Sequence, residues 1–203
     1  MKTSEDWSIE FDLLYNNISS NQAPGLTDYE KSRFLTQAQE SVILDFYKGT
    51  QGDAFETTEE VTRYLSFLVK TSNLNLALKQ DTSYEYEANL KNVEYPIWFI
   101  TYQSARLENN RDVIIVPTKQ EFLFKDLNNP FRGPNNNRVL SISENDNLTL
   151  YSKYPSKDCY IKYLKRPLEI DLESEDFVVE APESLHNHIL LRAVQLAKAV
   201  WQM

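Results

Sequence analysis

The residue types that most often bind metals or attack substrates are scarce in this chain of 203 residues. His186 and His188 are its two histidines. Residues two apart on a helix point in different directions, unlike the i,i+4 pairs that chelate zinc. We therefore predict two surface histidines and no metal site. Cys159 has no histidine near it in the sequence, so we predict a half-buried thiol and no nucleophile.

Sequence motifs of catalysis are missing as well. The chain contains no Gly-x-Ser-x-Gly, His-Glu-x-x-His or Walker sequence. With 4 glycines it has little from which to build a phosphate-binding loop. Carboxylate pairs could be drawn from residues such as Asp45, Glu59 or Glu121, but among 30 acidic residues such pairs arise by chance. These observations predict that the protein is not an enzyme and uses no cofactor.

The charge balance excludes further classes. A net charge of -9 argues against a protein that grips nucleic acid, because that requires clustered Lys and Arg to neutralise phosphates. No run of 18 apolar residues exists, so we expect no membrane span. The first residues lack the apolar region of a secretory signal. The single cysteine excludes internal disulfides and fits a reducing compartment.

The C-terminal stretch is the element on which the rest of the chain should pack. Residues 182–203 form a predicted helix, with Pro182 suited to its first position. Its apolar residues cover more than one face, so the helix should be packed on two sides. They are Leu185, Ile189, Ala193, Leu196 and Val200 on one face, and Leu190, Val194, Ala197 and Trp201 beside them.

Helices are also predicted in the N-terminal part. Residues 1–8 read as a loose segment, and Ile9–Ile18 as a short helix. Thr27-x-x-Glu30 is a capping box, in which each side chain satisfies a backbone N–H of the other residue. It begins a helix that should end near Gly49. Thr57-x-x-Glu60 is a second capping box and begins a further helix through Leu68.

The middle of the chain changes to strand-like patterns. Period-two alternation around Leu74–Leu78 and Tyr84–Ala88 and a run of β-formers from Ile97 to Tyr102 predict strands. A turn at 108–112 and a returning strand at 113–116 follow. Thr118-x-x-Glu121 is a third capping box and predicts a short inserted helix. Three more strands, around 139–142, 148–151 and 160–164, suggest an antiparallel meander.

The predicted fold class is therefore α+β: N-terminal helices and a C-terminal helix packed together, with a mostly antiparallel, β-rich middle that contains a short inserted helix. We predict one domain, divided into a helical part at 9–70, a β-rich lobe at 71–165, an acidic linker at 166–181 and the final helix at 182–203. The β-rich middle could be an open sheet or a small barrel.

Two segments are irregular by their chemistry. Residues 128–137 contain two prolines, a glycine and a run of asparagines, a composition typical of loops. Residues 169–180 are acidic, and they read either as a solvated linker or as a wall that repels nucleic acid. Aromatic residues on the strands leave a different class of function open. Trp98, Tyr102 and Tyr151 could form platforms of a small carbohydrate-binding module.

Several stretches together resemble a known family. They are Phe11-x-x-Leu14-Tyr15-x-x-Ile18, Ala23-Pro24-Gly25-Leu26-Thr27-Asp28-Tyr29-Glu30, Asn129-Pro130-Phe131-Arg132-x-Pro134, Tyr163-Leu164-Lys165-Arg166-Pro167 and Ala181-Pro182-Glu183-Ser184-Leu185-His186. In order and spacing they resemble virion ring proteins of crAss-like bacteriophages, and more broadly the head–tail adaptors of tailed phages. The resemblance covers most of the chain, although residues 50–95 carry little of it.

The resemblance implies a structural role in the virion. Such adaptors form a ring, usually dodecameric, that joins the portal protein to adjacent neck or tail ring proteins. The ring leaves a central channel through which DNA passes without specific binding. We therefore expect a homo-oligomer that is made in the host cytoplasm and is located at the head–tail junction, with no membrane partner. Another neck or tail-hub ring component is the nearest alternative.

Two sets of candidate site residues follow from this resemblance. The first set is an oligomer or portal interface formed by Asn129, Pro130, Phe131, Arg132 and Pro134. The second set is an acidic lining of the channel formed by Glu169, Asp171, Glu173, Glu175 and Asp176. Ring contacts need two different faces of one subunit. The helical layer and the strand-rich middle could supply these faces.

Overall fold

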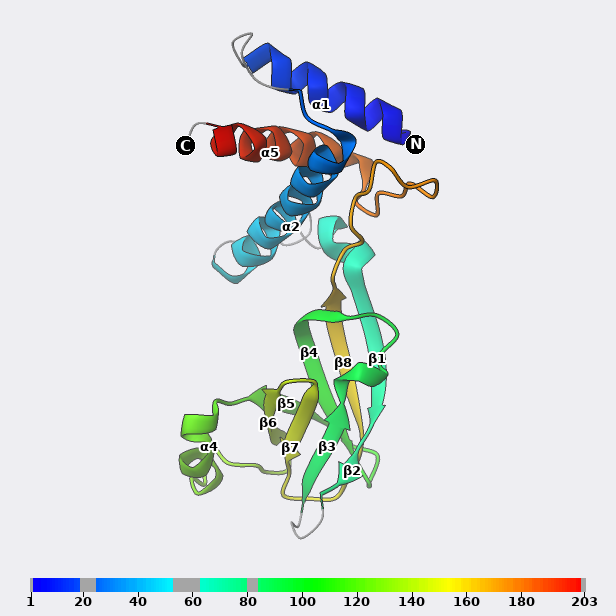
Figure 1. Cartoon of the computed structure of the whole chain (residues 1–203). Coiled ribbons are helices and arrows are strands. Elements are labelled where there is room, and N and C mark those ends of the chain that lie inside the picture. Colours follow the sequence, from blue (N-terminus) through cyan, green and yellow to red (C-terminus); the bar gives the residue numbers. More distant parts are fainter. Residues whose placement is uncertain (1, 19–24, 53–62, 80–83, 202–203) are drawn as a thin grey trace. The chain divides into compact units, whose positions relative to one another are not determined.

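Figure 1 shows a computed structural model of the chain, which describes residues 2–18, 25–52, 63–79 and 84–201. Contacts divide the chain into two compact units. The helical unit comprises Met1–Leu68 and Pro167–Met203, and the β unit comprises Val69–Arg166. The predicted α+β class is confirmed. The prediction of a single adaptor-like domain stays a prediction.

Helix α1, Ser4–Ile18, begins earlier than predicted. Residues 1–8 were expected to be loose, but Thr3 and Asp6 cap the helix reciprocally. The Thr3 backbone N–H donates to Asp6 Oδ2 at 2.8 Å, and the Asp6 N–H donates to Thr3 Oγ1 at 3.2 Å. The early start brings Trp7 into the core, where it is fully buried beside Phe11. An aspartate thus replaces the usual glutamate of a capping box.

Helix α2, Asp28–Gly52, begins at the predicted capping box. The Thr27 N–H donates to Glu30 Oε2 at 2.8 Å, and the Glu30 N–H donates to Thr27 Oγ1 at 3.3 Å. The helix continues past the predicted end at Gly49. The second predicted capping box, Thr57-x-x-Glu60, lies outside the described residues. The helix expected after it is seen at residues 63–65 and in the short 3₁₀-helix η1, Ser66–Leu68.

Helix α5, Glu183–Trp201, is packed on two sides as predicted. Its buried residues join those of α1 and α2 in one apolar cluster. The buried residues that α5 contributes are Leu185, Ile189, Leu190, Ala193, Val194 and Ala197. Val200 was also predicted on the packed face, but it is exposed near the end of the helix.

A buried ammonium group joins α1 to α2. Lys31 is almost fully buried, and its Nζ lies 2.7 Å from Asp12 Oδ2, 3.4 Å from Asp28 Oδ1 and 3.0 Å from Ser8 Oγ. A buried charge is costly unless it is paired and hydrogen-bonded. These contacts satisfy that requirement and fix the position of α1 on α2.

The β unit is one eight-stranded sheet in the order β1-β8-β4-β5-β6-β7-β3-β2. The strands are β1 Val69–Asn75, β2 Ala77–Leu78, β3 Glu85–Asn89, β4 Ile97–Leu107, β5 Asp112–Pro117, β6 Arg138–Glu144, β7 Asn147–Tyr151 and β8 Ser156–Lys165, with the 3₁₀-helix η2 Leu90–Asn92 between β3 and β4. All pairs are antiparallel except β5 with β6, which is parallel.

The two ends of this sheet meet. Strands β1 and β2 stand at opposite ends of the order, yet Leu76 alone separates them in the chain. The segment 69–78 therefore pairs with β8 through its first part and with β3 through its last part. The sheet must curl into a small barrel to do this. Apolar residues from most of the strands fill the core of this barrel.

The predicted meander of the last three strands is confirmed for β6 and β7, which pair antiparallel, but wrong for β8. Strand β7 lies between β6 and β3, and β8 lies between β1 and β4. Period-two alternation identifies a strand but does not identify its neighbour, which burial of the common core selects. The hairpin of β4 and β5 is confirmed. Its turn contains Asn110 with a φ of 60°, a left-handed conformation that asparagine tolerates well.

Helix α4, Gln120–Leu127, connects the parallel strands β5 and β6. Its predicted capping box is wrong, because Lys119 is the N-cap residue and makes no side-chain cap. Thr118 is held elsewhere: its N–H donates to the Ser141 carbonyl oxygen at 2.8 Å, and its hydroxyl donates to Asp126 Oδ2 at 3.0 Å. The inserted helix therefore starts later than expected.

Candidate functional site

The chain's nucleophilic and metal-binding residue types are separated in the structure. His188 is exposed, but His186 is buried, so the prediction of two surface histidines is wrong for His186. The reason is that α1 begins early and covers the start of α5 with Trp7. Within the described residues no group of three or more His, Cys, Asp or Glu side chains could hold a metal ion.

Cys159 lies on β8 and is fully buried in the barrel core, more deeply than predicted. Burial raises the pKa of its thiol to about 12, so the nucleophilic thiolate is disfavoured. The carboxylates considered as chance pairs do not converge. Asp45 pairs with Arg192 at 3.4 Å, Glu121 lies 4.0 Å from Lys119, and Glu59 lies outside the described residues.

The three aromatic residues considered as a saccharide platform do not share one surface. Trp98 and Tyr102 are on β4 and Tyr151 is on β7, with β5 and β6 between them. Along the curved sheet, β4 and β7 are three strand spacings apart, or about 14 Å. Tyr102 packs edge-on against Tyr160, with ring centroids 6.3 Å apart. These positions do not make the continuous stacking surface that the platform idea requires.

The most exposed apolar residues of the β unit lie on α4 and the turn after it. We call residues 118–137 the α4 lobe. None of the residues of α4 is buried, and Figure 1 shows the helix at the side of the strands. Phe124 is 81 % exposed and Phe131 is 86 % exposed, with Phe122 and Leu127 also exposed. A cluster of large, solvent-exposed apolar side chains is typical of an interaction surface.

The turn of the α4 lobe is built by hydrogen bonds around Asn129. The side-chain oxygen of Asn129 accepts from the N–H groups of Phe131 at 2.8 Å and Arg132 at 3.3 Å. Its carbonyl oxygen accepts from the Gly133 N–H at 2.7 Å. The guanidinium of Arg138 donates to the carbonyl oxygens of Phe131 and Gly133. Phe131 is therefore held outward by a defined turn.

Gly133 is required by the close approach of this turn. A Cβ atom there would lie 2.8 Å from the Asn129 carbonyl oxygen and 3.1 Å from that of Asp126. Both atoms belong to the backbone, so neither can move without changing the turn. The predicted interface residues thus come together: Pro130, Phe131 and Arg132 are exposed, and Asn129 and Pro134 are half-buried.

Sequence reasoning missed the contribution of α4 itself. It predicted a short helix through Phe122 and Leu127 but did not predict that this helix is exposed. A signal was present, because Phe122 and Phe124 are two apart and cannot both face one core from a single turn. The neighbouring Asn-rich, Pro-rich turn is also a poor partner for burying them.

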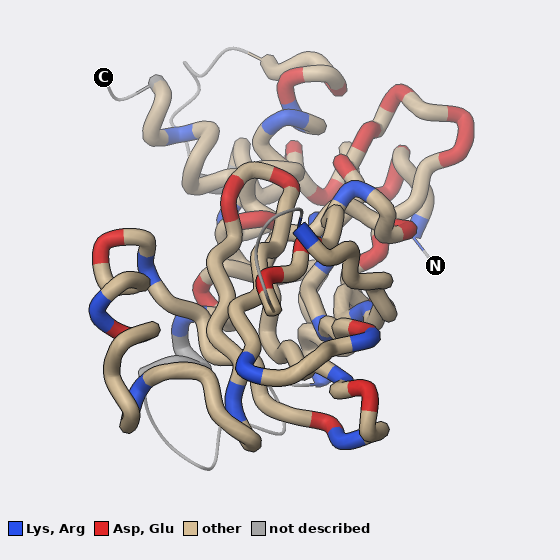
Figure 2. The backbone as a smooth tube through the Cα atoms, turned by 90° about the horizontal axis from the view of Figure 1, so that it is seen from below, with Lys and Arg blue, Asp and Glu red and all other residues tan. Residues whose placement is uncertain are grey.

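The backbone of the acidic segment is fixed in place, and most of its acidic side chains are exposed to solvent. Ile170 and Leu172 are buried in the helical core, while Glu169, Asp171 and Glu173 alternate with them and are exposed. Glu175 and Asp176, the remaining predicted members, are exposed in the loop that follows. Figure 2 shows acidic residues recurring along this loop near the N-terminus.

Helix α2 holds the acidic segment through a ladder of polar side chains. The Ser32 hydroxyl oxygen accepts from the Leu172 N–H at 2.9 Å, and Thr36 Oγ1 accepts from the Ile170 N–H at 3.0 Å. Gln39 Nε2 donates to the Leu168 carbonyl oxygen at 2.8 Å. The three side chains lie on one face of α2 and satisfy the backbone of an extended chain. The acidic side chains consequently point away from α2.

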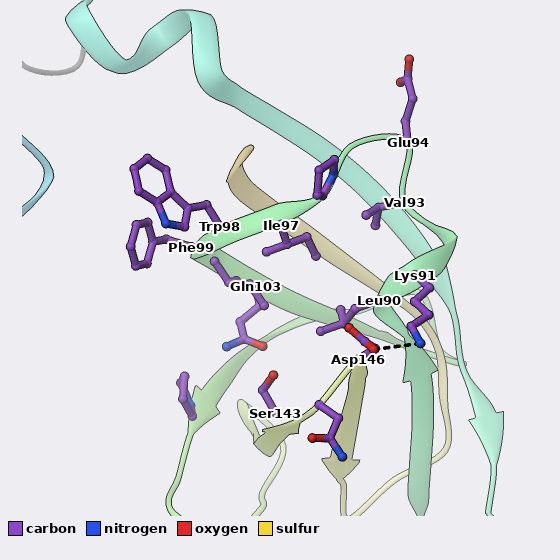
Figure 3. A pocket seen from close by; sticks show the side chains of 14 residues that line it. Leu90, Lys91, Val93, Glu94, Ile97, Trp98, Phe99, Gln103, Ser143 and Asp146 are labelled. Atoms are coloured by element: carbon purple, nitrogen blue, oxygen red, sulfur yellow. Dashed lines mark ion pairs between the residues drawn. The ribbon is translucent and has the colours of Figure 1, made fainter. Parts of the chain in front are cut away.

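The β unit also contains a pocket of about 760 Å³, which Figure 3 shows from close by. One wall is aromatic: the rings of Trp98 and Phe99 lie side by side with centroids 5.0 Å apart. Leu90 and Ile97 form an apolar floor that continues the barrel core. An ion pair between Lys91 and Asp146, 2.9 Å long, crosses the rim.

Gln103 and Ser143 add polar groups to the pocket wall (Figure 3). The described lining offers no convergent set of acids, bases and nucleophiles. It has the character of a docking site, with apolar walls and few polar groups. No helix in the described part of the chain is long and apolar enough to cross a membrane.

Comparisons with known proteins find relatives along the whole chain. The whole chain, residues 1–203, matches the family described as Phage tail ring protein 3/4. It is 34% identical to Ring protein 3 of Bacteroides phage crAss001, over 96% of this chain and 94% of that protein. It is 29% identical to Ring protein 4/5 of the same phage, over 97% and 92% of the two chains. The chain therefore belongs to the tail ring protein 3/4 family of crAss-like phages.

Proposed function

We propose that many copies of this protein assemble into a ring in the neck of a phage virion. The ring joins the portal protein to the next neck or tail ring and surrounds the channel for DNA. Membership of the ring protein family supports the ring, and the scarcity of convergent reactive groups in the described residues fits a structural role. A dodecamer is the expected stoichiometry, because the head–tail adaptors that this chain resembles usually form dodecameric rings.

The observation that carries this proposal is the α4 lobe. Phe124 and Phe131 are almost fully exposed, yet the turn that presents Phe131 is fixed. The Phe131 N–H donates to the Asn129 side-chain oxygen, and Arg138 donates to the Phe131 carbonyl oxygen. Aromatic residues presented in this way are typical anchors of protein interfaces. We assign Asn129, Pro130, Phe131, Arg132 and Pro134 to the contact that holds each copy in the assembly. An eight-residue helix with no buried side chain gains stability from such a contact.

The acidic segment is the candidate for the channel wall. Glu169, Asp171, Glu173, Glu175 and Asp176 lie in a stretch without Lys or Arg between Arg166 and Arg192. Because the buried Ile170 and Leu172 hold the segment on α2, its acidic side chains stay on the side that faces away from α2. A wall of this charge repels phosphates and lets DNA pass without binding. Replacing these five residues by Gln and Asn should slow DNA passage through assembled particles while leaving ring formation intact.

Native mass spectrometry with the portal from the same genome tests the ring. We expect a closed complex with one copy of this protein per portal subunit. The variant Phe131→Ala, Arg132→Ala should lose this complex while its monomer unfolds at the wild-type temperature. Tyr29→Ala, which removes an exposed aromatic ring from the helical unit, is the matched control and should assemble normally.

A second position in the same neck is the alternative that an observation favours. The relatives in phage crAss001 carry the names Ring protein 3 and Ring protein 4/5, so related chains there have different ring designations. If the portal alone does not bind this protein but another neck ring does, the protein occupies a lower ring. Failure to assemble with any neck component would refute the ring proposal as a whole.

A further inference from the structure

We propose that the pocket of the β unit receives the α4 lobe of a second copy of this chain, with Phe131 of one copy packed against Trp98 and Phe99 of the next. This inference rests on the proposed ring and names the two surfaces that join its subunits. The donor and the acceptor use different residues, so the contact is heterologous and can repeat around a closed ring.

The two surfaces match in chemistry. The α4 lobe presents phenylalanines that nothing in the described chain covers, and the pocket presents an aromatic wall above an apolar floor. Trp98 belongs to neither apolar core cluster of the described residues, although it is half-buried. Aromatic rings prefer to pack edge-on or offset against other rings. A phenylalanine entering here would meet two such rings at once.

The chain's own lobe does not fill the pocket. Pro117, the residue before the lobe, lines the pocket, but no residue of 118–137 does. The short helix α4 instead stands beside the strands with all its side chains at least partly exposed. The lobe of another copy can therefore enter the pocket, and in a ring the nearest molecule is another copy.

The α4 lobe and the pocket also match in size and in charge. Two exposed phenylalanines contribute about 300 Å² or more of the roughly 800 Å² that each partner buries in a standard interface. In the lobe, Lys119, Lys125 and Arg132 outweigh Glu121 and Asp126, in a chain whose net charge is -9. At the pocket rim Lys91 is paired with Asp146, which leaves the exposed Glu94 as excess negative charge. Arg132 of one copy and Glu94 of the next are the complementary pair.

Site-specific photocrosslinking in the assembled neck tests the contact. Phe131 is replaced by p-benzoylphenylalanine, a photoreactive analogue of the same shape, and the crosslinked peptides are identified by mass spectrometry. We expect crosslinks to residues 90–103 of another copy. Tyr29, an exposed aromatic residue of the helical unit, carries the probe in the control and should not label that segment.

Two complementary defects give a second test. Phe131→Glu should disable only the lobe, and Trp98→Glu only the pocket, so each variant alone should lose the ring. Mixed together, they retain one intact contact and should form a two-copy complex that grows no further. Arg132→Glu should weaken assembly by about tenfold or more, and adding Glu94→Arg should restore most of it. Monomer unfolding curves confirm that each variant is folded.

The outcomes separate this inference from the proposed function. If the ring forms but Phe131 crosslinks to the helical unit or to a different protein, the pocket assignment is overturned and the ring stands. If wild-type complexes stop at two copies that exchange lobes reciprocally, the heterologous arrangement is overturned. If wild-type protein never joins a neck assembly, the proposed function fails, and the inference fails with it.

Discussion

The imidazole of His186 packs against the indole of Trp7, with ring centroids 4.9 Å apart and planes tilted by 58°. The Nε2–H of His186 donates to the Ala181 carbonyl oxygen at 2.9 Å. This contact joins the first turn of α1 to the first turn of α5. It also ties the end of the acidic segment to the helical core, because Ala181 lies between that segment and α5.

We predict that Trp7→Ala lowers the free energy of unfolding by about 3–5 kcal/mol, since it empties a fully buried site. Trp7→Phe should cost much less, because the indole N–H has no hydrogen-bond partner among the described residues. Denaturant unfolding measures both. His188→Ala, at the exposed histidine, is the control. A loss for Trp7→Phe as large as that for Trp7→Ala would contradict this account.

The ladder between α2 and the acidic segment gives a second prediction. Ser32→Ala removes the acceptor of the buried Leu172 N–H and should destabilise the helical unit by about 1–3 kcal/mol. Hydrogen exchange should show faster exchange of that N–H first. Ser184→Ala, at an exposed serine of α5, should change neither quantity. If the Leu172 N–H of Ser32→Ala is as well protected from hydrogen exchange as in wild type, the Ser32 hydroxyl does not hold the segment.

The capping boxes predict a dependence of stability on pH. Hydrogen bonds from the Thr27 backbone N–H, and then from its hydroxyl, lower the pKa of Glu30 below its ordinary value of 4.5. A depressed pKa contributes stability above the unfolded-state pKa, and this contribution is lost as pH falls through the folded-state pKa. Wild type should therefore lose stability below about pH 4.5 more steeply than Glu30→Gln.

The free energies of unfolding of wild type and Glu30→Gln, plotted against pH, should meet at low pH, where Glu30 is protonated in wild type. Thr27→Ala removes the hydroxyl part of the cap and should flatten the dependence in part. The measurement is the free energy of unfolding across pH 2 to 7, with urea as denaturant. If the free energies of unfolding of wild type and Glu30→Gln change in parallel with pH, the lowered pKa of Glu30 does not explain the pH dependence.

Cys159 should report on opening of the barrel. Its thiol is buried and its pKa is raised to about 12, so it should not react with a disulfide reagent at pH 8 in folded protein. Reactivity should appear together with global unfolding, because the whole core around β8 must open. The labelling rate is measured against denaturant concentration. Fast labelling of the folded protein would mean that the barrel opens locally.

Gly133→Ala tests whether the turn of the α4 lobe must be fixed for assembly. The added Cβ would meet the Asn129 carbonyl oxygen at 2.8 Å, so the turn has to shift and Phe131 has to move. We expect clearly weaker ring assembly with an almost unchanged unfolding temperature, since the lobe contributes no residue to the barrel core. Gly25→Ala, where a Cβ meets no atom within 4 Å, is the matched control. Normal assembly of Gly133→Ala would show that the turn is not needed.

Local elements were largely readable from the sequence. The capping box at Thr27 predicted the start of α2, the apolar residues of α5 predicted packing on two sides, and the hairpin of β4 and β5 followed from its turn. These features are encoded in windows of a few residues by hydrogen-bonding chemistry and by the helix and strand periods. The capping box at Thr118 failed because a distant carbonyl oxygen, that of Ser141, holds the threonine.

By itself, the sequence determined the α+β class, most of the helices and strands, the irregular turn around Asn129 and the order of motifs that identifies the family. Tertiary structure alone decided which strands are neighbours, that the sheet closes through segment 69–78, and that Trp7 and His186 are buried while Phe124 and Phe131 are exposed. The reason is that periodicity marks which face of an element is apolar, whereas the surface that covers this face, or leaves it uncovered, comes from residues far away in the chain.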